Sequence, residues 1–182
     1  MKKLLLSAAL VLAAFGISKA QIYMSKSCEI SFFSSAPLEN ITAVDKTTKP
    51  LLNAANGQVL FKMTIKGFMF EKELMREHFN ENYMESDKYP YAEFKGNINE
   101  KIDYTKDGTY DVTVTGKLTI HGVEKERTIK GKLTVKGKEV SIDCKFNVAL
   151  KDHNITVPEL MFQKIAESVE VTVKATLVQK EK

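Results

Sequence analysis

Apolar and polar residues alternate along most of the chain with a period of two. Between residues 110 and 120 the apolar side chains fall on the even positions, and polar ones take most of the odd positions. Such alternation predicts a strand with one buried and one solvated face. The same pattern recurs, more or less strongly, at residues 28–32, 40–46, 59–65, 92–98, 129–135, 140–150 and 169–177.

Turn-forming pairs separate these stretches. Asn56-Gly57 and Asp107-Gly108 are hairpin signals, and His121-Gly122 and Lys136-Gly137-Lys138 mark two further turns. About eight short strands with such spacing are typical of an all-β sandwich or barrel. We expect an eight-stranded antiparallel barrel, which removes exposed strand edges and is wide enough to hold side chains or one slender ligand.

Two segments break the period of two. Residues 71–82 place Leu74, Met75, His78 and Phe79 on one helical stripe, which predicts a helix between strands. Following Phe68-Met69-Phe70, such a helix could cover one end of a barrel. Residues 157–166, with Pro158 near the first turn, predict a shorter helix before the last strand.

Residues 1–20 have the organisation of a secretory signal peptide. Lys2 and Lys3 precede an apolar run over 4–17, and Ser18-Lys19-Ala20 forms a small-x-small cleavage site. The alternative is a transmembrane anchor, but the run is short for a bilayer. We therefore expect a single domain over 21–182, without a transmembrane segment, in the periplasm or outside the cell.

Charge and cysteine content narrow the function classes. The formal net charge of +4 falls to +1 once the three lysines of residues 1–20 are removed, since that segment holds no acid. A near-neutral domain without a basic stripe lacks the positive charge pattern that is typical of nucleic-acid binding. Cys28 and Cys144 fit either a disulfide or two separate buried thiols. The three histidines lie far apart, so we expect neither a metal site nor a cofactor.

Catalytic motifs are weak. The chain has no glycine-rich phosphate loop and no nucleophilic serine elbow. Glu77 beside His78, and Asp152 beside His153, are adjacent in sequence, and neighbours on a helix do not face each other. We expect a protein that is not an enzyme, with a hydrolase or isomerase using His78 or His121 as the remote alternative.

Two motifs resemble the YceI-like family. The first comprises Met75-Arg76-Glu77-His78-Phe79 with Asp87-Lys88-Tyr89-Pro90 and Phe94-Lys95-Gly96, and the second is Thr115-Gly116-Lys117-Leu118-Thr119-Ile120-His121-Gly122-Val123. The resemblance implies an extended lipocalin-like barrel that binds a long isoprenoid chain or a similar lipid in its interior. It places Arg76, His78 and His121 at motif positions, as contacts to a polar head group or as bonds that fix the helix and the turn.

The apolar composition agrees with either a lined cavity or a filled core. Ten Phe, six Tyr and seven Met occur without any Trp, and flexible Met beside Phe suits an adaptable lining. A packed-shut barrel acting as a structural or stress-related interaction module is the alternative, and a homodimer is compatible with either. The predicted ligand-binding residues are Phe32, Phe61, Met63, Ile65, Phe68, Phe70, Met75, Arg76, His78, Phe79, Phe94, Val112, Val114, Leu118, His121, Ile142, Phe146 and Val171.

Overall fold

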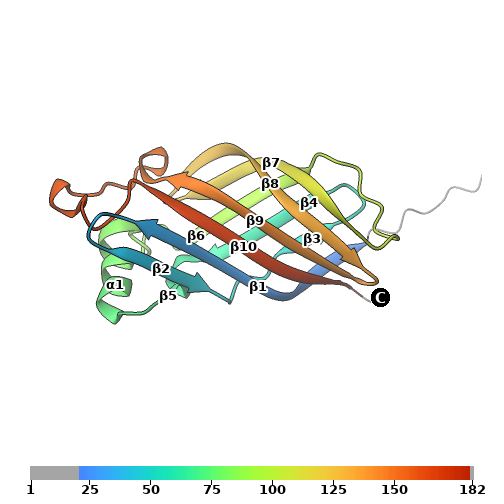
Figure 1. Ribbon diagram of the computed structural model, residues 1–182, viewed down its shortest axis with the longest axis horizontal. Helices are drawn as coiled ribbons and strands as arrows, with labels where there is room; N and C mark the ends of the chain where they lie inside the picture. The colour runs from blue at the N-terminus through green and yellow to red at the C-terminus, as the bar shows by residue number, and fades with distance from the viewer. Residues whose placement is uncertain (1–20, 181–182) are drawn as a thin grey trace, which may run out of the picture.

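The computed structural model describes residues 21–180, and the expected signal peptide over 1–20 lies outside them. The described chain is dominated by one antiparallel sheet, drawn in Figure 1. Its strands are β1 (Ile22–Ser35), β2 (Asn40–Asp45), β3 (Leu51–Asn53), β4 (Gln58–Thr64), β5 (Met69–Phe70), β6 (Tyr91–Ile98), β7 (Gly108–Ile120), β8 (Val123–Lys136), β9 (Glu139–Ala149) and β10 (Ser168–Gln179).

The sheet closes on itself. The ring runs β1–β3–β4–β6–β7–β8–β9–β10, and β10 pairs back with β1 from Tyr23↔Gln179 to Phe33↔Glu170. On its other edge β1 pairs with β3 near its beginning and with β2 near its end. Since β2 and β3 pair with the same edge of β1, they are the two halves of one interrupted strand. In the same way β4 pairs with β3 and β5 pairs with β2, so β4 and β5 are the halves of a second interrupted strand. The predicted eight-stranded antiparallel barrel is therefore confirmed.

A buried carboxylate holds the interruption between β2 and β3. Asp45 is fully buried, and its side chain accepts hydrogen bonds from the backbone N–H groups of Thr47 (3.1 Å) and Thr48 (3.0 Å) and from both hydroxyls. The facing break between β4 and β5 contains the 3-10 turn Ile65–Gly67. A Cβ on Gly67 would lie 2.6 Å from Oδ1 of Asp45, so only glycine lets the two breaks approach.

Paired glycines allow two strands to come close on the inner face. Gly96 of β6 lies opposite Gly116 of β7, and a Cβ on Gly116 would lie 2.4 Å from the Cα of Gly96. The ring of Phe94 folds over Gly96, where a Cβ would lie 2.9 Å from the ring Cζ. The missing side chains therefore make room for an aromatic ring on the inner wall.

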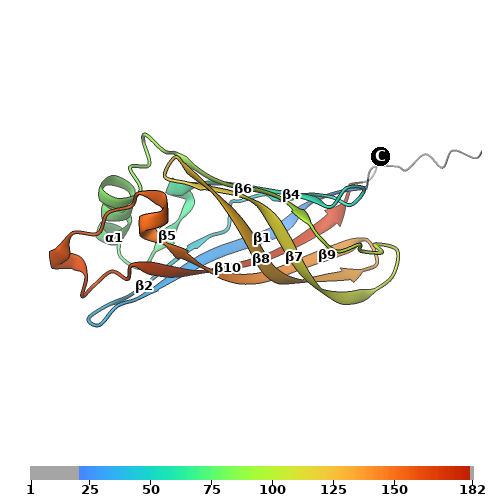
Figure 2. The ribbon, with the colours of Figure 1, turned by 90° about the horizontal axis from the view of Figure 1, so that it is seen from above.

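The helical segments gather at one end of the barrel, while β10 ends at the other (Figures 1 and 2). Helix α1 (Glu73–His78) continues as a π-helical turn, Phe79–Tyr83, so the predicted helix is present but begins two residues later. The second predicted helix is reduced to one 3-10 turn, Glu159–Met161, and a further 3-10 turn spans Leu150–His153. In the turn Glu159–Met161, Leu160 is 94 % exposed, whereas Met161 faces the cavity. No helix among residues 21–180 has the length and apolarity to cross a membrane.

Asp45→Ala is expected to lower the free energy of unfolding by about 3 kcal/mol, because the buried backbone N–H of Thr48, the part-buried N–H of Thr47 and both hydroxyls lose their acceptor. Burial opposes ionisation, but the bonds from Thr47 and Thr48 outweigh it and hold the pKa of Asp45 below its ordinary value of 3.8. The carboxylate therefore contributes stability above about pH 4, which is lost as the pH falls through the folded pKa.

Chemical denaturation of wild type and Asp45→Asn across this acid range measures how the free energy of unfolding depends on pH. This dependence should be weaker in Asp45→Asn than in wild type. Asp111→Asn is the matched control, since that carboxylate is 87 % exposed and paired with Lys132 on the outer face. Equal acid slopes in wild type and Asp45→Asn would contradict this account.

Candidate functional site

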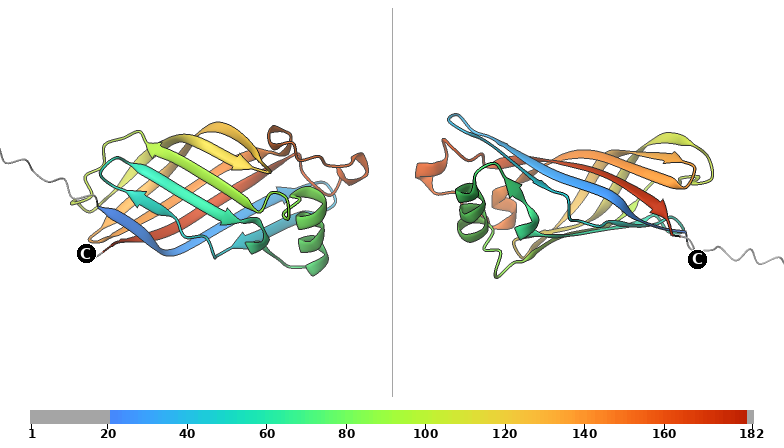
Figure 3. Two further views of the ribbon diagram at one scale, coloured as in Figure 1. Left: turned by 180° about the vertical axis from the view of Figure 1, so that it is seen from behind. Right: turned by 90° about the horizontal axis from the view of Figure 1, so that it is seen from below.

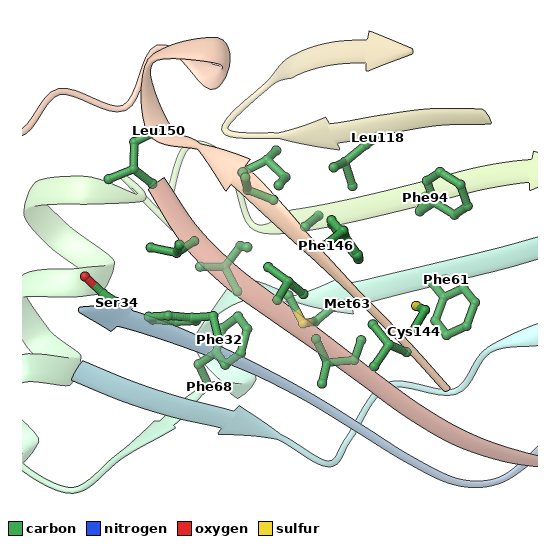
Figure 4. Close-up of a pocket in the computed structure, with 18 of the residues that line it drawn as sticks. Phe32, Ser34, Phe61, Met63, Phe68, Phe94, Leu118, Cys144, Phe146 and Leu150 are labelled. Atoms are coloured by element: carbon green, nitrogen blue, oxygen red, sulfur yellow. The ribbon is translucent and has the colours of Figure 1, made fainter. Parts of the chain in front are cut away.

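The barrel encloses a cavity of about 300 Å³ that extends inward from the α1 end. Inward-facing side chains of most strands and of α1 form its wall, and Figure 4 shows several of them pointing into one space. Phe61, Phe94 and Phe146 face this space from three different strands, yet each is only half-buried. Inward aromatic rings that retain accessible surface border an unfilled volume rather than a packed core.

An aromatic cluster covers the cavity at the α1 end. The rings of Phe32 and Phe79 stack at 5.6 Å between centroids, while Phe68 meets both edge-on at 5.1 and 5.7 Å. Phe70 lies 5.0 Å from Phe79. Because Phe79 comes from the helical segment and the other three from the barrel wall, these contacts hold α1 over the end of the barrel.

The opening at this end, here called the mouth, is bordered by the β1–β2 turn, α1 and the connection 157–167 (Figure 2). Ser34 Oγ accepts the N–H of Ala166 at 3.0 Å, and the N–H of Leu38 bonds the carbonyl of Gln163 at 2.8 Å. Glu39 forms an ion pair at 3.6 Å with Lys72, the residue that precedes α1. Polar groups are therefore concentrated at the mouth, whereas the deeper wall is apolar.

The mouth also holds two basic side chains. Lys164 and His78 both border the cavity, and neither forms an ion pair with any residue in 21–180. Since Glu39 is neutralised by Lys72, Lys164 supplies the unpaired positive charge next to the opening.

The opposite end is closed. Tyr23, Leu52, Leu133 and Leu177 are each at most 1 % exposed there, and only Leu133 also borders the cavity. The cavity is thus a one-ended pocket and not a tunnel through the barrel.

The structure brings most of the predicted ligand-binding residues together. The cavity wall contains Phe32, Phe61, Met63, Ile65, Phe68, Phe70, Met75, His78, Phe79, Phe94, Val112, Val114, Leu118, Ile142, Phe146 and Val171. Arg76 and His121 lie off this wall, and Arg76 is paired with Glu73 on the outer side of α1. Contact of the sixteen with a ligand remains a prediction.

His121 occupies the tight turn between β7 and β8. Ile120 pairs with Val123, and both turn residues, His121 (φ 50°) and Gly122 (φ 71°), are left-handed, as a two-residue hairpin turn requires. Its ring bridges two acceptors, Oε2 of Glu85 at 2.8 Å and the carbonyl of His153 at 3.2 Å. His121 therefore ties the connection before β6 to the rim of the barrel.

The two family motifs meet at this turn. The rings of Tyr89 and His121 are in edge contact at 4.4 Å, and a Cβ on Gly122 would lie 2.6 Å from Cε1 of Tyr89. Glycine is required at this position both for its backbone angle and for the space the tyrosine occupies. His78 borders the mouth and His121 bonds outside the cavity, so the two histidines of the enzyme alternative do not share one pocket.

Several wall residues are missing from the predicted set. Ile30, Cys144, Val148 and Val173 share the inner faces of predicted strands, so the period of two alone would have identified them. Leu150 continues the apolar positions of the predicted strand 140–150, whereas Ile155, Met161 and Ile165 come from the irregular connection before β10, where no period marks the inward side chains.

The two cysteines are free thiols. Cys28 is on β1 and Cys144 on β9, with β10 between them, and they are offset by two positions along the ladder. Burial raises the pKa of Cys28 to about 12 and that of Cys144 to about 11, which suppresses thiolate formation. Of the two alternatives, the structure has two separate thiols, and Cys144 contributes to the cavity wall. No group of three or more His, Cys, Asp or Glu side chains in residues 21–180 is placed to hold a metal ion.

The fold and the site together define a closed antiparallel barrel with an apolar pocket open at one end. The chain belongs to the family of YceI-like domains, whose model matches residues 14–177. The resemblance seen in the two motifs is thus confirmed.

Solved structures share this fold. A polyisoprenoid binding domain from Saccharophagus degradans, implicated in plant cell wall breakdown, has a TM-score of 0.73 at 12 % identity, covering 89 % of this chain and all of that one. BcnA from Burkholderia cenocepacia has a TM-score of 0.69 at 17 % identity, covering 82 % and 95 %. The YceI protein of Campylobacter jejuni has a TM-score of 0.57 at 15 % identity over the full length of both. No curated protein sequence matches the chain.

His153, a buried histidine at the rim, makes the stability of the fold depend on pH. Burial lowers the pKa of His153 below its ordinary value of 6.5, partly offset by its bond to the carbonyl of Val123 at 3.1 Å; Asp152 and Arg127 act in opposite directions. The unfolded chain therefore takes up the proton first, and stability falls as the pH drops below about 6.5. Thermal melts from neutral to mildly acidic pH should show a smaller loss in His153→Gln than in wild type, and a wild-type slope in the exposed control His78→Gln. An unchanged slope in His153→Gln would refute the assignment.

Proposed function

We propose that this chain is an exported lipid-binding protein that holds the apolar tail of a single-chain, isoprenoid-type lipid in the barrel cavity. The observation that carries the proposal is the unfilled apolar pocket, with half-buried Phe61, Phe94 and Phe146 facing it. An empty space lined by aromatic and aliphatic side chains stays dry and takes apolar guests.

The distribution of polarity supports one orientation of the ligand. The inner wall offers only dispersion contacts and burial, worth about 0.8 kcal/mol for each buried CH₂ group before entropy costs. Hydrogen-bonding and charged side chains, including Ser34, His78 and Lys164, border the mouth. The tail therefore lies inside, and the polar head group remains at the mouth, where water reaches it.

The relatives support the class of ligand. A structure of the same fold is described as a polyisoprenoid binding domain, and membership of the YceI-like family agrees with a binding role rather than catalysis. Export to the periplasm or beyond is part of the proposal and rests on the signal-peptide pattern of residues 1–20.

Native mass spectrometry of gently purified protein, followed by titration with prenyl alcohols, tests binding directly. A one-to-one complex with an isoprenoid-type lipid is expected. Repeated recovery of guest-free protein that takes up no prenyl chain on titration would overturn the proposed function and favour a barrel without a guest.

Val171→Trp is expected to weaken prenyl alcohol binding by about tenfold or more, because it inserts an indole between Phe32 and Phe146 on the cavity wall. Thr172→Trp is the matched control: it places the same side chain one residue along β10, on the outer face. Melting curves of both variants verify folding. Equal affinity of the two variants would show that the ligand lies outside the barrel.

A further inference from the structure

The inward-facing side chains of neighbouring strands stop bordering the cavity at one level of the barrel. On β7 they border it from Ile120, near the mouth, down to Val112, whereas Tyr110, the next residue on the same face, does not. On β8 the last bordering residue is Leu133, and on β9 it is Ile142. These two residues are paired in the β8–β9 ladder, so their side chains end the cavity side by side. We call this level, marked by Leu133 and Ile142, the floor of the pocket.

The barrel below the floor is filled. Val135 and Val140 are the next inward residues of β8 and β9; they pair with each other and are at most 2 % exposed. Ala175 and Leu177 on β10 are buried at the same end. None of these four borders the cavity. The space beyond the floor is therefore a packed core and not a continuation of the pocket.

Two tyrosine rings complete this core. A β-bulge shifts the register of β1 against β10 between Ser25 and Ser27, so Tyr23 points inward although it stands at an odd position. Its ring lies 5.7 Å from that of Tyr104, which comes from the irregular β6–β7 connection. Both side chains are buried, and neither borders the cavity. They belong to the closed end of the barrel and lie outside the pocket.

Leu133 is the side chain at which the pocket and the packed core meet. It is only 1 % exposed, yet it borders the cavity. Two residues closer to the mouth on β8 stands Gly131, which also borders the cavity and has no side chain to fill it. Along β8 the wall therefore changes from an open position to a full leucine side chain within one period of the strand.

The depth of the pocket follows from strand geometry. Ile120 and Val112 lie eight residues apart on β7, which is about 26 Å along a strand. Strands of a closed barrel tilt by about 40° from its axis, which leaves about 20 Å along the axis. One isoprene unit adds four chain bonds of about 1.5 Å in a zigzag, or roughly 5 Å. An extended tail therefore reaches the floor with about four isoprene units.

We propose that the floor formed by Leu133 and Ile142 sets the maximum length of the lipid tail, so the pocket selects single chains of about four isoprene units. This inference rests on the proposed function, because it specifies which isoprenoid-type chains the same pocket accepts. A longer tail that enters at the mouth leaves its surplus carbons outside the pocket, where they gain no burial. Affinity therefore stops rising once the tail reaches the floor.

The test measures affinity for a homologous series of linear prenyl alcohols from geraniol upward. For wild type, affinity is expected to rise by about fourfold per buried methylene (~0.8 kcal/mol) and to level off near about four isoprene units. Leu133→Ala removes three side-chain carbons at the floor, so a longer tail can bury more of its length. This variant should bind the alcohol one unit beyond the wild-type limit about tenfold or more tightly than wild type does.

Leu118→Ala is the matched control. Leu118 is also buried and borders the cavity, but it lies on β7 two residues before Ile120, toward the mouth. Removing the same three carbons there widens the pocket without deepening it. The control should shift the affinities of all chain lengths alike and keep the wild-type limit. Melting curves of both variants verify folding.

The outcomes separate the floor from the proposed function. If wild type binds none of the series, the proposed function fails. If wild type binds but folded Leu133→Ala levels off at the same chain length, or Leu118→Ala extends the limit equally, only the role of the floor is refuted. Should Leu133→Ala not fold, Ile142→Ala trims the ladder partner at the same level and gives the decisive comparison, since an unchanged limit there would refute the proposal.

Discussion

The pairing of β10 with β1 is the constraint on which the rest of the molecule depends. It runs along nearly the whole of both strands and turns an open sheet into a ring with an inside and an outside. Once the ring is closed, the period of two sends every second side chain into one shared interior. Because closure leaves the ends of the barrel as the routes to that interior, the way each end is covered decides whether the barrel is a packed core or a container.

The two ends are covered in different ways. At the closed end a bulge in β1 and a loop tyrosine bring Tyr23 and Tyr104 together, and Leu52 and Leu177 beside them are fully buried. At the mouth α1 is held by the ring contacts of Phe79 with Phe32, Phe68 and Phe70, and space remains beneath it. The packed-shut alternative therefore describes one end of this barrel, whereas an unfilled pocket describes the other.

Alternation predicted the strands and the composition of the inner wall because both follow from the same local rule. The period of two alone assigned Phe32, Phe94 and Phe146 to one interior, and the structure places them there. Alternation does not predict which side chains point inward where the backbone is irregular. The bulge that turns Tyr23 inward and the loop that inserts Tyr104 have no periodic signal. His121 shows a different limit, since a motif position indicates importance but not whether the side chain faces a ligand or, as here, fastens a turn to Glu85.

The mouth is held more weakly than the barrel wall. Besides the ring contacts of Phe79, three polar contacts cross it: the backbone bond from Leu38 to Gln163, the bond from the N–H of Ala166 to the Ser34 hydroxyl, and the ion pair between Glu39 and Lys72. Each such bond contributes about 1 kcal/mol or less, whereas opening the wall between β1 and β10 would break an entire ladder. Local opening with few broken bonds costs the least free energy, so the pocket is most easily reached between the β1–β2 turn, α1 and the connection 157–167. In Figure 3 these three segments stand together at one end, apart from the turns that close the other. A barrel whose wall is a closed ring of paired strands and whose mouth is crossed by few bonds leaves one place where its interior is most easily reached.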